Sequence, residues 1–100
     1  MNTTTVDFLA HDAGDAVAVA VRDIEPGEVS VAFLDGSPSV TVAARHPIPL
    51  GHKVALANVA SGDKVTEYSL PIGLATQDIT KGDYVHTHNV RSARWQNSVA

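Results

Sequence analysis

The strongest backbone constraint in this chain lies in the stretch His46-Pro47-Ile48-Pro49-Leu50-Gly51-His52-Lys53-Val54-Ala55-Leu56. Its two prolines fix φ and remove two backbone donors, so residues 46–50 are expected to form a rigid extended connector outside the middle of a sheet. Gly51 then allows a turn into a short apolar strand at residues 54–56. A stiff lead-in and a buried strand can hold polar groups in place, which makes His52 and Lys53 candidate site residues. The alternative is a crossover whose His and Lys are simply solvated.

The composition indicates one domain rich in β-sheet. The chain has 100 residues, 44% of them hydrophobic, and Val and Ala dominate over two Phe, two Tyr and one Trp. Small and β-branched side chains suit a pleated sheet, and this length suits a single core. The formal charge of −4, without a basic run, argues against nucleic acid as a partner.

The absence of cysteine excludes a disulfide framework and a thiolate zinc site, which fits a reducing compartment. No segment approaches the roughly 20 apolar residues of a membrane-spanning helix, and residues 1–10 lack a basic start and a long apolar run. We therefore expect a cytoplasmic protein with no membrane partner.

Alternating apolar residues predict short strands rather than helices. Residues 16–22 alternate, with three valines on one face, and no stretch of ten or more residues has a convincing period of 3.6. Strands are expected at 6–9, 16–22, 29–34 and 40–44, the last two joined by a hairpin loop at 35–39. The predicted class is all-β, with at most single helical turns.

A short pattern occurs three times, always between two predicted strands. Its copies are Asp23-Ile24-x-x-Gly27, Asn58-Val59-x-x-Gly62 and Asp78-Ile79-x-x-Gly82. We interpret each copy as a tight corner, in which Asp or Asn bonds its own downstream backbone, the aliphatic residue enters the core and Gly takes a conformation that other residues avoid. The unequal spacing argues against a solenoid.

A second polar cluster follows the third corner, at His86-Thr87-His88-Asn89. If residues 84–90 are extended, His86 and His88 project to the same face, roughly 6.5–7 Å apart. Such a pair can grip a metal or an anion, and Asn89 can orient one ring or contact a substrate. Two histidines do not complete a metal site, so a polar strand end facing solvent is the alternative.

Several motifs together resemble the N-terminal domain of the altronate and galactarate dehydratases, to which the small (alpha) subunit of (2R)-sulfolactate sulfo-lyase is similar. They are Gly51-His52-Lys53-Val54-Ala55-Leu56, the Asn58-Val59-x-x-Gly62 corner, Tyr68, Pro71-Ile72-Gly73-Leu74-Ala75 and Gly82-Asp83-x-Val85-His86-Thr87-His88-Asn89. The resemblance implies an SAF domain, a β-clip fold of short bent strands, over residues 1–90, followed by a C-terminal tail at 91–100.

The resemblance also implies a function. Its members are lyases that eliminate water or sulfite from a 2-hydroxy acid, several with iron(II) or another divalent cation. Most of their catalytic machinery lies in a region of about 400 residues, more than one domain in length. We expect the small subunit, or a fragment, of a lyase that eliminates water from a sugar acid or related 2-hydroxy acid. It is expected to be inactive alone and to share a divalent metal with a separate large catalytic subunit. The alternatives are the sulfo-lyase alpha subunit, a non-catalytic substrate-binding module and a structural stabiliser; a homo-oligomer is compatible with all of them.

The resemblance assigns roles to six residues. They are catalytic His52 and Lys53, substrate-binding Tyr68 and Asn89, and metal-binding His86 and His88. The sequence departs from the family at Glu67, where members usually carry a basic residue that suits a carboxylate. Either Glu67 points away from the site, or the substrate is not the usual sugar acid.

The tail at 91–100 holds the only Trp, Trp95, together with Arg91 and Arg94. It is either a disordered terminus with an incidental Trp or a segment that docks on the large subunit, because Trp and Arg are enriched at interface hot spots. Docking predicts that Trp95→Ala weakens binding of the large subunit by about 2 kcal/mol, roughly 30-fold in Kd. A blue shift of Trp95 fluorescence when the partner is added tests docking in the wild type, whereas the Kd of Trp95→Ala is measured by a method that does not use this Trp. A change in Kd below about twofold would contradict the docking.

Overall fold

The computed structural model describes residues 6–67, 70–86 and 88–92, and this part of the chain contains nine strands and no helix. The strands are β1 (Phe8–Ala10), β2 (Val17–Ala20), β3 (Gly27–Phe33), β4 (Val40–Ala44), β5 (Lys53–Ala55), β6 (Lys64–Glu67), β7 (Leu70–Ala75), β8 (Tyr84–Val85) and β9 (Val90–Ser92). The predicted all-β class is confirmed. No helix in the described ranges is long and apolar enough to cross a membrane.

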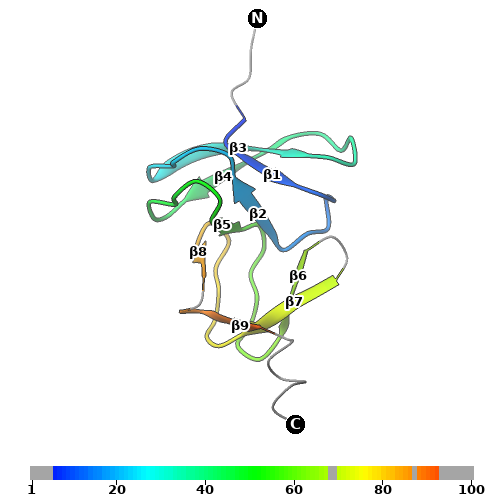
Figure 1. Ribbon diagram of the computed structural model, residues 1–100, viewed down its shortest axis with the longest axis vertical. Coiled ribbons are helices and arrows are strands. Elements are labelled where there is room, and N and C mark those ends of the chain that lie inside the picture. Colours follow the sequence, from blue (N-terminus) through cyan, green and yellow to red (C-terminus); the bar gives the residue numbers. More distant parts are fainter. Residues whose placement is uncertain (1–5, 68–69, 87, 93–100) are drawn as a thin grey trace, which may run out of the picture.

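The strands form two sheets, with the three-stranded sheet below the six-stranded one in Figure 1. The larger has the order β4-β3-β1-β2-β5-β8, and the smaller has the order β6-β7-β9. Only β1 and β3 pair in parallel among these strands. The predicted hairpin is present as β3 and β4, whose register places Val31 opposite Val40.

Two apolar clusters make the core, and strands β2 and β5 contribute residues to both of them. Ala18 and Ala20 of β2 and Val54 of β5 belong to the first cluster, whereas Val17 and Ala55 belong to the second. Neighbouring residues of a strand point to opposite faces, so a strand between two clusters is apolar on both sides. Because both faces of β2 are buried, valines alternate with alanines in residues 16–21 instead of with polar residues. The strand ends at Ala20, earlier than predicted.

All three predicted corners have the expected glycine conformation. The φ angles of Gly27, Gly62 and Gly82 are 140°, 89° and 95°, and both corner isoleucines, Ile24 and Ile79, are 2% exposed.

The predicted bonding of the corner Asp and Asn was wrong. Each side chain accepts a hydrogen bond from a distant segment instead of its own downstream backbone: Asp23 from Leu50 N, Asn58 from Lys81 N and Asp78 from Ser61 N. The reason is that the corners lie in pairs, joined by single bridges between Ile24 and Ile48 and between Val59 and Ile79. A side chain beside a bridge residue therefore lies next to the backbone of the paired segment and bonds that backbone instead of its own.

The proline-rich stretch is a fourth corner. Ile48 is buried and exchanges both backbone hydrogen bonds with Ile24, and Gly51 has a φ of 85°. Pro47 and Pro49 have no N–H to extend this pairing, so it stays a single bridge. The prediction that residues 46–50 stay out of the middle of a sheet is thereby confirmed.

Each of three corners is fastened to one buried alanine. Gly51 N donates to Ala20 O at 2.9 Å, and His52 O accepts from Ala20 N at 2.8 Å. The same exchange joins residues 62–63 to Ala75 and residues 82–83 to Ala55. These paired bonds fix the backbone of His52 against β2.

We predict that Gly62→Val lowers the free energy of unfolding by roughly 1–3 kcal/mol, because a β-branched residue is strained at positive φ. A Cβ at Gly62 would meet no atom within 4 Å, so the loss reports backbone strain alone. Gly14 has equal space without a positive φ and makes Gly14→Val the matched control. Urea denaturation measures the free energy of unfolding of both variants. Equal losses in the two variants would show that the φ of Gly62 is not the cause.

Candidate functional site

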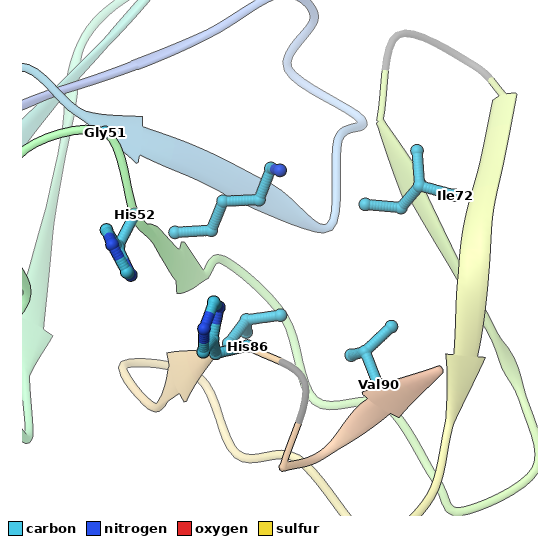
Figure 2. A pocket seen from close by; sticks show the side chains of 7 residues that line it. Gly51, His52, Ile72, His86 and Val90 are labelled. Carbon is cyan, nitrogen blue, oxygen red and sulfur yellow. The ribbon is translucent and has the colours of Figure 1, made fainter. Parts of the chain in front are cut away.

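A pocket of about 380 Å³ lies between the two sheets. One wall comes from the six-stranded sheet and the residues beside it, and the other from β7 and β9. Figure 2 shows His52 and His86 next to each other on one side, with Ile72 and Val90 on the other. The pocket is lined by Gly51, His52, Lys53, Ile72, Val85, His86 and Val90. It is therefore polar at one end and apolar at the other.

Strand register brings the two predicted histidine clusters together. β5 and β8 pair antiparallel, with Lys53 opposite Val85 and Val54 opposite Tyr84. Continuing this register by one residue places His52 opposite His86, and their ring centroids are 4.9 Å apart. Residues from two separate motifs thus lie side by side in the candidate site, and their chemical roles stay predictions.

Tyr84 organises this site, although sequence reasoning did not select it. Its hydroxyl is hydrogen-bonded to Nδ1 of His52, and its ring stacks on His86 at 5.6 Å with an interplanar angle of 4°. His88 lies on Tyr84 as well, at 5.7 Å between centroids. A hydroxyl on Nδ1 fixes the orientation of His52 and leaves Nε2 as the nitrogen available for chemistry.

The condition that residues 84–90 are extended, on which the same-face geometry of His86 and His88 depended, is not met. β8 ends at Val85, and the N–H groups of Asn89 and Val90 both donate to His86 O, which closes a turn. The cause is the side chain of Asn89, which is 2% exposed. It accepts from His86 N at 3.0 Å and donates to Tyr84 O at 2.8 Å. An Asn that bonds nearby backbone favours a turn over a strand.

The structure locates Asn89 among the remaining predicted residues, whereas others lie outside the part of the chain that it describes. Both polar groups of Asn89 bond backbone, so its visible role is to hold the turn that carries His86, and contact with substrate stays a prediction. Tyr68 lies outside the described residues, as do Arg94 and Trp95 of the tail. Strand β9 runs to Ser92, two residues past the expected end of the domain at 90.

Lys53 is paired rather than isolated. Its Nζ lies 3.9 Å from Oε1 of Glu67, and both side chains are partly buried. Glu67 therefore reaches Lys53 without itself lining the pocket, which argues against the alternative in which it points away. The acidic residue that stands where family members usually carry a basic one is thus paired with the candidate catalytic lysine.

The described residues do not by themselves form a metal site. In these ranges no group of three or more His, Asp or Glu is placed to hold an ion. The assignment of His86 and His88 as ligands stays a prediction, and further ligands would have to come from elsewhere.

We predict that Asn89→Ala lowers the free energy of unfolding by about 1–3 kcal/mol, because it leaves His86 N and Tyr84 O without their side-chain partner. The imidazole resonances of His86 should shift in the same variant, since the turn that carries the ring loosens. Gln77→Ala, at an exposed position, is the control. Unchanged stability together with unchanged His86 resonances would show that Asn89 does not hold this turn.

Comparisons with known proteins identify the family of this chain. A family profile for the altronate/galactarate dehydratase SAF domain matches residues 6–93. The chain is 38% identical over 93 residues to the (2R)-sulfolactate sulfo-lyase subunit alpha of Chromohalobacter salexigens, covering 91% of this chain and 99% of that protein. It is 42% identical over 88 residues to the altronate dehydratase of Escherichia coli, covering 87% of this chain but 17% of that enzyme. These matches confirm the resemblance drawn from the motifs, and the chain belongs to the altronate/galactarate dehydratase SAF domain family.

Proposed function

We propose that this chain is the small subunit of a lyase that eliminates water or sulfite from a sugar acid or related 2-hydroxy acid, together with a separate large catalytic subunit. One observation carries the proposal: the chain spans 99% of a relative that is itself named a subunit alpha, but 17% of a dehydratase. The name subunit alpha implies a partner subunit for that relative, and we propose the same arrangement for this chain. Coverage of the whole sulfo-lyase subunit favours sulfite as the leaving group.

The pocket offers groups that suit such an elimination. The reaction removes a proton near a carboxylate, stabilises the anion that forms and assists the leaving group. His52 can exchange a proton through Nε2, and Lys53 can stabilise negative charge. Both lie on one wall of an open pocket, where a second chain can cover them.

Tyr84 orients His52 for proton transfer through Nε2. When Nδ1 carries the proton and donates to the hydroxyl oxygen, Nε2 is a free acceptor and can act as a base. The imidazolium formed when Nε2 takes up a proton can then return it as an acid. The stacked ring of His86 limits rotation of Tyr84 and keeps this hydrogen bond aligned.

The proposal includes a divalent metal such as iron(II), shared with the large subunit. When bound at the joint site, it would supply a Lewis acid for the carboxylate or the developing enolate. The described residues do not complete a ligand set, so no step above depends on the metal. Exposed His86 and His88 are the groups that this chain would offer to it.

The test is reconstitution of the chain with its large subunit, assayed with sulfolactate and with altronate. We expect no turnover by the 100-residue chain alone, turnover by the complex, and a loss of about 10²–10⁴-fold in kcat for His52→Ala in the complex. Both eliminations give a keto acid, so release of sulfite is the readout that distinguishes the two leaving groups.

His46→Ala is the matched control, because His46 is an exposed histidine paired with Asp83 outside the pocket. Its kcat should stay near that of the wild type. Turnover by the chain alone would overturn the subunit assignment. A complex with His52→Ala that keeps full kcat would leave the chain a non-catalytic binding or stabilising module.

A further inference from the structure

The ion pair between Lys53 and Glu67 joins the two sheets at the pocket. Lys53 begins β5 in the six-stranded sheet, and Glu67 ends β6 in the three-stranded sheet. Their side chains are 35% and 18% exposed, and the charged atoms are 3.9 Å apart. Partial burial weakens solvent screening, so the two charges interact more strongly than a fully exposed pair.

The pair of Lys53 and Glu67 offsets the fixed positive charge of the pocket. Lys53 is the only Lys, Arg, Asp or Glu among the described residues that line it. The other lining groups are two imidazoles, a glycine and three aliphatic side chains. Glu67 offsets the one permanent cation, and an incoming anion meets an ammonium that already has a carboxylate partner.

We propose that Glu67 sets the charge preference of the pocket, as an internal counter-ion that competes with the anionic group of a ligand for Lys53. The ligand class is a small carboxylate, sulfonate or similar oxyanion, whose negative oxygens take the place of Oε1 of Glu67 beside Nζ. Affinity of the free subunit for such groups is thereby kept low. This inference rests on the proposed function for the biological meaning of the pocket, but the charge competition is a property of this chain alone.

The experiment measures binding of inorganic sulfate to the full-length chain at low ionic strength, from the shifts of the Lys53 and His52 backbone amides in NMR spectra. Glu67→Gln keeps the size of the side chain and removes its charge. We expect this variant to bind sulfate roughly fivefold more tightly than the wild type. This factor corresponds to the upper end of the energies found for exposed ion pairs.

Two further variants separate the local competition from a general effect of charge. Glu28→Gln changes the net charge equally at an exposed position on β3, and its affinity for sulfate should stay within a factor of about 1.5 of the wild type. The double variant Lys53→Met with Glu67→Gln should lose the gain, because the freed cation is gone.

Three results would overturn the proposal: no gain in Glu67→Gln, an equal gain in Glu28→Gln, or a gain that survives in the double variant. The same spectra report whether each variant is folded. No turnover is measured, so a failed lyase assay and a failed sulfate titration remain distinguishable. Tighter sulfate binding by Glu67→Gln supports the inference even where reconstitution gives an inactive complex.

Discussion

The exchange of two backbone hydrogen bonds between a corner and a buried alanine is the constraint on which this structure depends. It joins residues 51–52 to Ala20, residues 62–63 to Ala75 and residues 82–83 to Ala55, and thereby ties distant segments to β2, β5 and β7. At Gly82 the missing side chain also lets a further segment approach, because a Cβ there would lie 2.1 Å from Ala43 O of β4. A Cβ at Gly51 or Gly62 would meet no atom within 4 Å, so glycine serves the positive φ at those two corners. A Val- and Ala-rich sequence suits such contacts better than a core of large aromatic side chains.

In the three corners that bond an alanine, the residue after the glycine determines which side chain lies at the end of the corner. At two corners it is an aspartate, and Asp83 accepts from Thr80 N and pairs with Arg45, so it serves the turn itself. At the proline-rich corner it is His52, whose side chain is free of the turn and bonds Tyr84 instead. Pro47 and Pro49 stiffen this corner, which limits the positions that His52 can reach. The candidate site is thus one copy of a repeated structural unit with a titratable ring at its end.

Local pattern was enough to predict most of the fold, but not the composition of the site. The glycine corners, the hairpin and the all-β class follow from spacing of Gly, Pro and β-branched residues. The fourth corner was missed because Pro47 stands where the others have Asp or Asn. Tyr84 was missed because its contact with His52 depends on pairing of β5 with β8, which no local pattern encodes. The turn at His86 was read as a strand because the side chain of Asn89, rather than alternation, decides its conformation.

The placement of the two pocket walls depends on contacts at one small residue. Ala16 N donates to Thr66 O of β6 at 3.0 Å, and Ala16 O accepts from Leu56 N, next to β5, at 2.7 Å. Ala16 therefore connects the strand that ends at Glu67 with the strand that begins at Lys53, and it does so through backbone bonds that tolerate little change in length. Because the walls belong to different sheets, a small shift of this connection would change the distance between Nζ and Oε1. The charge of the pocket is consequently linked to how the two sheets pack.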